Sequence, residues 1–200
     1  MYRYVVFVGM ELASPVRVLS RGPQVEMRLL EPRDAEAYAR FRGTPVEAVP
    51  VLRRLADGHV GVAAWLDGEI VCAAWYAFGT VWVDEIERPL TLVADEAYVY
   101  DSYTTESLRG LGIAAVRGEW AIGHFRGLGF RRTVGWVSPQ NLPAFGPARK
   151  LGATTLGRAG YVRVGPWRRE FVQPFGRERR WAARGEAIVL ERDFDLVRDD

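Results

Sequence analysis

Residues 104–114 read TTESLRGLGIA, and this stretch decides the fold. An apolar, aromatic run at residues 97–105 predicts a strand before it, and a helical pattern follows at residues 112–127. Gly110 and Gly112 let the turn present backbone N–H groups, because glycine has no Cβ to interfere. A helix start adds unpaired N–H groups and the positive end of the helix dipole. Together these features favour a ligand that contains phosphate or pyrophosphate.

Arg109 is available as a charge partner for such a ligand, and a dinucleotide site is one alternative for this turn. The glycines at 110 and 112, followed by Ala115, fit the dinucleotide fingerprint loosely. That fingerprint requires an acidic residue about 20 positions further on, at the end of the next strand, to bind ribose. Here the next strand ends in residues 137–140, VSPQ, which contain no carboxylate. The dinucleotide interpretation is therefore disfavoured.

The turn resembles more closely the signature of the GNAT superfamily of N-acetyltransferases. That signature is arginine or glutamine, two residues, glycine, one residue, then glycine or alanine, and residues 109–114, RGLGIA, agree with it. A second family motif places an asparagine before a helix that ends in KLG. Asn141 and residues 149–152, RKLG, are similar to this motif. The resemblance covers about residues 25–172, and the order of the predicted elements is also that of the family.

The hydrophobic pattern predicts an α/β protein. Asp67-Gly68 between two apolar runs indicates a tight hairpin, because such a turn needs positive φ. Strands are expected at residues 1–10, 25–30, 60–66, 70–78, 97–105, 132–137, 161–164, 169–172 and 187–190, and the stretch to residue 95 is loosely patterned. Helices are expected from Pro32, from Thr44-Pro45 (with Val46, Val49, Val51, Leu52 and Leu55), at 112–127 and at 141–151.

The apolar face of the helix at residues 112–127 is expected to contain Ile113, Val116, Trp120, Ala121 and Phe125, with Arg117 on another face.

The resemblance implies the GNAT fold for this chain. That fold is a mixed sheet of six or seven strands, flanked by helices and splayed open at the strand that holds the cofactor. Residues 25–172 would form the acyltransferase domain. Residues 1–24 are interpreted as an N-terminal extension that contains a strand, and residues 173–200 as a C-terminal extension without an assigned role. These extensions are candidates for contacts in a homodimer.

Composition argues against several other functions. A net charge of +2 is too small to indicate a nucleic-acid partner. Cys72 is the single cysteine, so the chain has no internal disulfide, and His59 and His124 are the only histidines, without metal-binding spacing. The apolar run at residues 4–8 is too short to span a membrane, and no cleavage pattern follows a charged start. We therefore expect a cytoplasmic protein without metal, nucleic acid or membrane partners.

Acetyl-CoA is the co-substrate that the resemblance implies. The N–H groups of residues 111–114 would hold the pyrophosphate of coenzyme A. The strand backbone near residues 103–105 would pair with the pantetheine arm and polarise the thioester carbonyl. Asn141 would contact the arm from the opposite side. The predicted cofactor-binding residues are Tyr103, Thr104, Thr105, Arg109, Gly110, Leu111, Gly112, Ile113, Ala114 and Asn141.

Two carboxylates are candidates for the catalytic base that accepts the amine proton. Glu96 stands thirteen residues before Arg109, the interval at which the histone-acetylating branch of the family places its glutamate base. Residues 105–110, TESLRG, also resemble that branch. The alternative is that Glu96 is a solvated residue at the end of a strand. Asp101 is the second candidate, because a carboxylate in mid-strand among tyrosines has to be paired or functional.

One position departs from the family pattern. Many members have a tyrosine seven residues after the asparagine, as the proton donor to the departing thiol, and here that position is Ala148. Gly146-Pro147 is also expected to interrupt the helix. Either the thiolate leaves without this donor or another tyrosine replaces it. The candidates are Tyr98, Tyr100, Tyr103 and Tyr161.

The sequence thus predicts an N-acetyltransferase that moves an acetyl or other acyl group from acyl-CoA to a primary amine of a small molecule or peptide. The alternative is a non-catalytic acyl-CoA-binding or regulatory module. The acceptor would lie near the first two helices, residues 78–95 and the last strands. Four tryptophans either line this pocket or belong to the core: Trp75, Trp82, Trp136 and Trp167.

Overall fold

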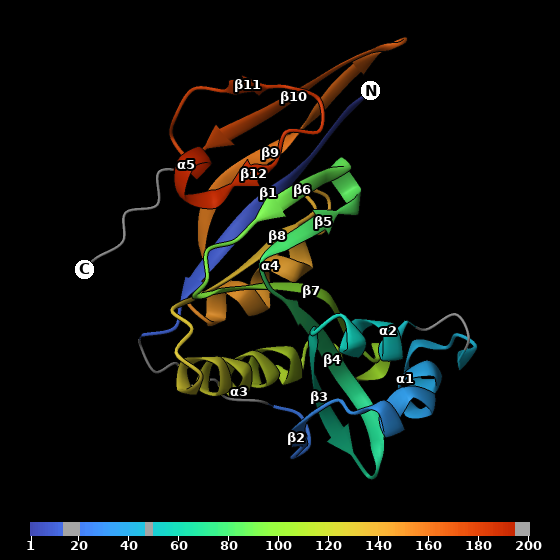
Figure 1. The fold of residues 1–200 in the computed structure, drawn as a ribbon. Coiled ribbons are helices and arrows are strands. Elements are labelled where there is room, and N and C mark those ends of the chain that lie inside the picture. The colour runs from blue at the N-terminus through green and yellow to red at the C-terminus, as the bar shows by residue number, and fades with distance from the viewer. Residues whose placement is uncertain (14–20, 47–49, 195–200) are drawn as a thin grey trace.

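The computed structural model describes residues 1–13, 21–46 and 50–194. Its main feature is one large twisted sheet with helices on both faces of its lower part (Figure 1). Nine strands follow one another across this sheet in the order β11-β10-β9-β1-β8-β7-β4-β3-β2. A second sheet among the described residues has the order β12-β6-β5. The α/β class is as predicted, and the main sheet is larger than the expected six or seven strands.

The strands of the described residues are β1 (Tyr2–Glu11), β2 (Glu26–Leu29), β3 (Val60–Leu66), β4 (Glu69–Ala77), β5 (Thr80–Val83), β6 (Arg88–Thr91), β7 (Glu96–Thr104), β8 (Arg132–Val137), β9 (Thr154–Val164), β10 (Trp167–Pro174), β11 (Arg180–Ala182) and β12 (Ile188–Val189). The α-helices are α1 (Ala35–Arg42), α2 (Val51–Ala56), α3 (Ile113–Gly127), α4 (Leu142–Lys150) and α5 (Leu190–Phe194). Among the described parts of the chain, no helix is both long enough and apolar enough to cross a membrane.

The sheet divides at the neighbouring strands β7 and β8, which run parallel. Their pairing begins at Glu96 opposite Arg132 and ends at Val99 opposite Gly135. Beyond Val99, β7 continues to Thr104 with β4 as its described neighbour, whereas β8 continues beside β1. We call this divergence the split. It separates a lower arm, β7-β4-β3-β2, from an upper arm, β8-β1-β9-β10-β11 (Figure 1).

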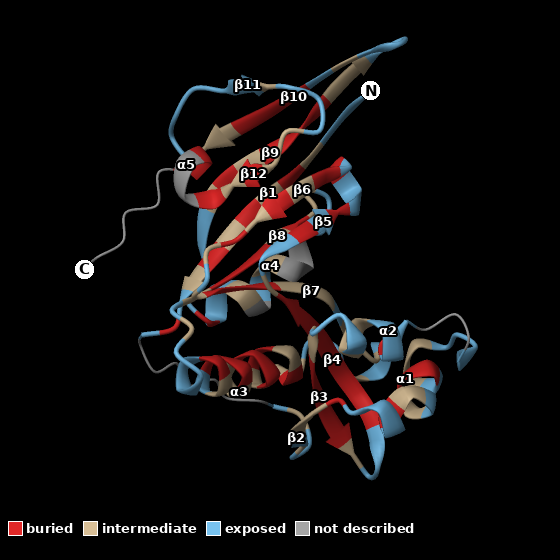
Figure 2. Cartoon of the chain, in the orientation of Figure 1, coloured by how far each residue is buried: buried red, intermediate tan, exposed pale blue. Residues whose placement is uncertain are grey.

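The lower arm is covered on both faces, which explains why its central strands are apolar throughout. Helix α3 packs on one face, and α1 and α2 pack on the other (Figure 1). Residues of β3 and β4 are therefore buried almost without interruption (Figure 2). The Asp67-Gly68 turn joins these strands as predicted, with φ of 50° and 82° at its two residues.

The first strand lies inside the main sheet and not beside it. β1 pairs antiparallel with β8 on one side and with β9 on the other. Val5 and Phe7 face the core of the upper arm, so burial alternates along the strand. The predicted strand at residues 1–10 is therefore present, but the described part of residues 1–24 is not a separate extension. Without β1, the upper arm would lose its connection to β8.

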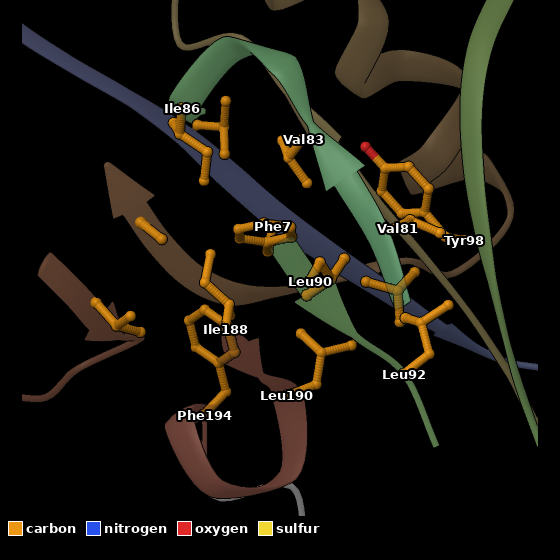
Figure 3. Packing of buried hydrophobic residues seen from close by; sticks show 14 of the residues in the cluster. Phe7, Val81, Val83, Ile86, Leu90, Leu92, Tyr98, Ile188, Leu190 and Phe194 are labelled. Atoms are coloured by element: carbon orange, nitrogen blue, oxygen red, sulfur yellow. The ribbon is translucent and has the colours of Figure 1, made fainter. Parts of the chain in front are cut away.

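The last segment of the chain also belongs to the core. The stretch predicted to be loosely patterned forms a hairpin of β5 and β6, and β12 adds to it in parallel. Figure 3 shows Ile188, Leu190 and Phe194 packing against Phe7 and Leu90 beside this hairpin. β11 extends the main sheet beside β10. The described part of residues 173–200 therefore closes one core and is not a separate extension.

A buried ion pair links the hairpin, the upper arm and the last segment. The fully buried Arg88 side chain contacts Glu170, with Nε 3.0 Å from Oε2. Its Nη2 donates a hydrogen bond to the carbonyl oxygen of Glu186 at 2.7 Å. Arg168 contacts the second oxygen of Glu170 at 3.0 Å. Burial lowers the pKa of Arg88, and the carboxylate of Glu170 opposes that effect.

Two helices differ from the expectation. The helix predicted from Thr44-Pro45 begins at Val51 in the described residues, and the predicted helix residue Val49 lies outside them. The backbone of α4 is helical throughout, so Gly146-Pro147 does not interrupt it. Proline has a fixed φ that suits a helix, and in so short a helix it removes one main-chain hydrogen bond.

We expect Arg88→Met to lower the free energy of unfolding by about 3–5 kcal/mol, because Glu170 would lose one of its two buried cations. Denaturant unfolding followed by circular dichroism measures this change. Arg33→Ala is the control, since that side chain is 73% exposed, and it should change stability by less than about 0.5 kcal/mol. Equal stabilities of Arg88→Met and the unmutated protein would show that the pair contributes nothing to folding.

Candidate functional site

A cleft of about 1710 Å³ opens at the split between β7 and β8. Its walls come from β7, the glycine turn, the start of α3, β8, α4 and side chains of α1, α2 and β5. Pockets for ligands of drug size usually measure about 300–1,000 Å³. This cleft therefore has room for a long cofactor together with a second ligand.

The glycine turn forms one end of the cleft. Gly110 and Gly112 have φ of 80° and 91°, values that glycine adopts without strain. Helix α3 begins at Ile113, and no described residue accepts a hydrogen bond from the N–H groups of Gly110, Gly112, Ile113 or Ala114. All four of these residues line the cleft. The turn therefore presents four open donors at the positive end of a helix of 15 residues.

Leu111 differs from its neighbours in the turn. Its carbonyl oxygen accepts a hydrogen bond from the N–H group of Arg21 at 2.8 Å, and Leu111 is not among the described residues that line the cleft. The Arg109 side chain is half exposed and folds back, with Nε donating to the carbonyl oxygen of Thr104 at 3.1 Å. Arg109 lines the cleft beside the turn, and Lys150 lines it from the end of α4.

The free edge of β7 forms one side of the cleft. Tyr103 and Thr104 line it, beyond the last residue pair with β8. Thr105 is not among the described residues that line the cleft, and its N–H group donates to the carbonyl oxygen of Val71 at 2.9 Å. Asn141 lies on the opposite side, immediately before α4, and its side chain is exposed. Tyr103 and Thr104 thus line the cleft from β7, and Asn141 lines it from the residue before α4.

A β-bulge in β7 shapes the middle of the cleft. Trp75 of β4 pairs with Tyr100 and Ala73 pairs with Tyr103, so β7 holds one extra residue between these pairs. Asp101 adopts a φ of 48°, a left-handed conformation that is uncommon outside glycine. As a consequence, the consecutive side chains of Tyr100 and Asp101 both contact Arg54 on the face covered by α1 and α2.

Asp101 is the centre of a polar cluster on that face. Arg54 Nη1 lies 2.7 Å from Asp101 Oδ2, and Arg42 Nη2 lies 3.1 Å from Oδ1. Tyr38 donates to Oδ2 at 3.3 Å and accepts from Trp75 Nε1 at 2.9 Å. Burial, and then the charge of Asp101, raise the pKa of Tyr38, so its hydroxyl remains a donor. Both carboxylate oxygens are therefore occupied, which favours Asp101 as an anchor for α1 and α2.

Glu96, the other predicted base, lies at the closed end of the split. Its side chain is 3% exposed and is not among the described residues that line the cleft. Glu96 Oε1 lies 3.3 Å from Arg132 Nη1, and these two residues face each other in the first pair of β7 and β8. The geometry therefore favours a structural role, in which the ion pair joins the two arms of the sheet.

Arg117 occupies a position that the helical pattern did not predict. It lies on the buried face of α3, 5% exposed, and lines the cleft. Its Nη2 donates to Ser102 Oγ at 3.1 Å, and its Nη1 lies 3.4 Å from Tyr76 Oη. Residues 113, 117, 121 and 125 recur every four positions, so the spacing placed Arg117 on the apolar stripe. Because Arg117 is charged, the hydrophobic pattern did not count it as part of this buried stripe.

His59 is a cleft residue for which the sequence offered no signal beyond its residue type. It precedes β3, and its Nδ1 lies 2.6 Å from the hydroxyl oxygen of Tyr100. Burial, and to a smaller extent the charge of Arg54, lower the pKa of His59, and Asp57 opposes them. Burial raises the pKa of Tyr100 to about 12. At neutral pH the pair thus consists of a neutral imidazole and a protonated phenol.

The remaining predicted residues divide between the cleft and the core. Trp82 and Trp136 line the cleft, whereas Trp75 is fully buried and Trp167 is 80% exposed at the start of β10. Ala148, at the position of the family's tyrosine, also lines the cleft. Within the described residues, no three His, Cys, Asp or Glu side chains are grouped so that they could hold a metal ion.

No protein-family model and no curated protein matches the chain, but solved structures do. A GCN5-related N-acetyltransferase from Sphaerobacter thermophilus matches with a TM-score of 0.56 and 16% identity, over 78% of this chain and 50% of that chain. A GNAT-family acetyltransferase from Colwellia psychrerythraea matches with a TM-score of 0.56 and 14% identity, over 78% and 54%. A GCN5-related N-acetyltransferase from Kribbella flavida matches with a TM-score of 0.52 and 19% identity, over 78% and 56%.

These matches show the fold of the chain. It has the GNAT fold, with the mixed sheet, the flanking helices and the split between two parallel strands. The chain spans about half the length of the solved structures that it matches.

Asp101→Ala should lower the free energy of unfolding by about 1–3 kcal/mol, because it leaves two partly buried arginines without their carboxylate. Chemical denaturation measures the loss. Asp57→Ala is the matched control, since that carboxylate is 56% exposed and pairs with an exposed arginine. If both variants are equally stable, the cluster does not anchor α1 and α2.

Proposed function

We propose that this chain, which has the GNAT fold, is an acyl-CoA-dependent N-acyltransferase. It would move an acyl group, with acetyl as the first choice, to a primary amine of a small molecule or peptide. One observation carries the proposal: the split in the sheet opens onto a helix start with unpaired N–H groups, inside one cleft. This arrangement suits a long ligand with a diphosphate at one end and an extended arm that can lie along a strand.

The residues present fit coenzyme A. The open N–H groups of Gly110, Gly112, Ile113 and Ala114 would hold its diphosphate. The free edge of β7 would pair with the pantetheine arm, with Tyr103 and Thr104 on one side and Asn141 on the other. Arg109 and Lys150 would add charge near the phosphates. Of the ten predicted cofactor residues, Leu111 and Thr105 contribute least, because neither lines the cleft among the described residues.

Coenzyme A supplies an acyl group in the form of a reactive thioester. The protein has to hold this thioester beside the β7 bulge, admit a neutral amine and accept one proton from it. The acceptor would approach from the face of α1, α2 and β5, where Trp82, Trp136 and Tyr98 line the cleft. An aromatic wall of this kind suits the apolar part of an amine substrate.

A non-catalytic acyl-CoA-binding module is the second candidate, and one observation favours it. Ala148 lines the cleft where the family pattern has the tyrosine that protonates the thiol. Release of free thiol from acetyl-CoA, measured with a panel of small amines and short peptides, separates the two candidates. Turnover with any amine supports the enzyme. Tight binding of coenzyme A without turnover of any amine supports the module.

The diphosphate site is tested by a charge at Gly110, where an added Cβ meets no atom within 4 Å. Asparagine and aspartate have almost the same shape and both tolerate positive φ better than most residues. We expect Gly110→Asp to weaken coenzyme A binding at least about tenfold more than Gly110→Asn, because only the aspartate repels the diphosphate. Calorimetric titration of each variant with coenzyme A measures the difference.

Both variants carry the same backbone strain, so unequal affinity reports charge and not folding. Equal affinities of Gly110→Asp and Gly110→Asn would place the diphosphate elsewhere. If the unmutated protein releases no heat and shows no thermal shift with coenzyme A, the proposed function is rejected.

A further inference from the structure

A hydrogen-bonded pair of ionisable side chains lies in the cleft, on the face of β7 that α1 and α2 cover. His59 comes from the residues before β3, and Tyr100 comes from β7 immediately before the bulge. The distance of 2.6 Å between His59 Nδ1 and the Tyr100 hydroxyl oxygen is that of a strong hydrogen bond. The two rings also meet edge to face, with centroids 5.7 Å apart. The pair is therefore held in one orientation by two separate contacts.

Tyr100 lies where β7 and β8 separate. Val99 is the last residue of β7 that pairs with β8, so Tyr100 is the first residue of the free edge. Tyr100 lines the cleft, and its ring stacks on that of Tyr98 at 5.8 Å. Its hydroxyl group thus lies on the face of α1 and α2 next to the bulge, where the proposed function puts the thioester.

The other proton acceptors in the cleft are less suited to this reaction. Among the described residues that line it, the carboxylates are those of Asp84, Glu85 and Asp101. Both oxygens of Asp101 are bound to arginines. Asp84 and Glu85 are exposed on the turn after β5, and carboxylates as a class are weaker bases than imidazole. His59 is the one histidine among the described lining residues.

Three charged or ionisable groups face His59. Arg54 of α2 and Asp57, which follows that helix, carry opposite charges, and Tyr100 of β7 contacts the ring directly. Burial and Arg54 outweigh Asp57, so the pKa of His59 lies below its ordinary value. The imidazole is therefore neutral at neutral pH and can accept a proton.

We propose that Tyr100 and His59 form a proton relay, in which Tyr100 takes the proton of the attacking amine and His59 is the final acceptor. This inference rests on the proposed function. Tyr100 is the catalytic residue of the relay, because it would touch the amine. His59 acts through Tyr100, so it is a positioning and proton-accepting residue behind it.

The neutral amine nitrogen forms a bond to the carbonyl carbon of the thioester. A proton on that nitrogen passes to the Tyr100 oxygen while the Tyr100 proton passes to His59 Nδ1. The C–S bond breaks, its electron pair stays on sulfur, and the thiolate takes a proton from water. The imidazolium of His59 then returns its proton to solvent, which leaves an amide, free thiol and the original relay.

The first experiment can be done without knowing the amine substrate. Nitrogen NMR of the labelled protein should show His59 as a neutral imidazole with Nδ1 unprotonated, since Nδ1 has to accept the Tyr100 proton. Tyr100→Phe should change the Nδ1 signal of His59 and leave that of His124 unchanged. A proton on Nδ1 in the neutral ring would reverse the hydrogen bond and overturn the relay.

The second experiment compares turnover in His59→Gln, Tyr100→Phe and the double variant, at saturating acyl-CoA and amine. We expect kcat to fall about 100-fold in each single variant. The double variant should lose little more, because the two groups act as one unit. The affinity for coenzyme A should stay unchanged. His124→Gln is the control, because His124 stacks on Trp120 and is not among the described lining residues.

The pH profile distinguishes proton transfer from a structural role. In the unmutated protein, kcat should rise with pH through the pKa of His59, below its ordinary value of about 6.5, because only the neutral ring accepts a proton. His59→Gln should lose this acid limb. If His59→Gln keeps its turnover while Glu96→Gln loses it, the relay is overturned and Glu96 is the acceptor. If the unmutated protein does not bind coenzyme A, the proposed function itself is rejected, whatever the variants show.

Discussion

The pairing of β7 with β8 is the constraint on which the rest of the structure depends. Among the described residues, β7 and β8 pair from Glu96 opposite Arg132 to Val99 opposite Gly135, and this segment joins the two arms of the sheet. The ion pair between Glu96 and Arg132 closes one end of this segment. At the other end, a Cβ on Gly135 would come within 2.9 Å of Val99 Cγ1, so the strands approach closely before they diverge. A longer pairing would close the cleft, and a shorter one would separate the arms.

The bulge in β7 is the second feature that shapes the cleft. It adds one residue between the pairs that Tyr100 and Tyr103 form with β4. Because of that residue, Tyr100 and Asp101 both reach the face of α1 and α2, although neighbours in a regular strand point to opposite faces. Asp101 binds the arginines that hold the helices, and Tyr100 remains in contact with His59. A local irregularity thus provides both an anchor for the helices and a hydroxyl group in contact with a histidine.

The first strand and the last described segment both support walls of the cleft, although neither lies near the glycine turn in sequence. β1 lies between β8 and β9, so it fixes the strand that forms the far side of the split. The last segment buries Ile188 and Leu190 beside the β5–β6 hairpin (Figure 3). Trp82 of this hairpin lines the cleft. Arg88 ties this hairpin to Glu170 inside the protein. This side of the cleft therefore depends on segments that are far from the glycine turn in sequence.

The sequence by itself determined the elements whose signals are local. Gly110 and Gly112 before an amphipathic pattern indicated the turn and α3, and Asp67-Gly68 indicated the hairpin, because these residues act through their own φ and the helical period. Tertiary structure decided everything that requires distant partners. It placed β1 inside the sheet, buried Glu96 against Arg132 and brought His59 to Tyr100. The residue type gives the ionisable group of a side chain. Only the tertiary structure decides whether that group faces a cleft or is paired with another charge.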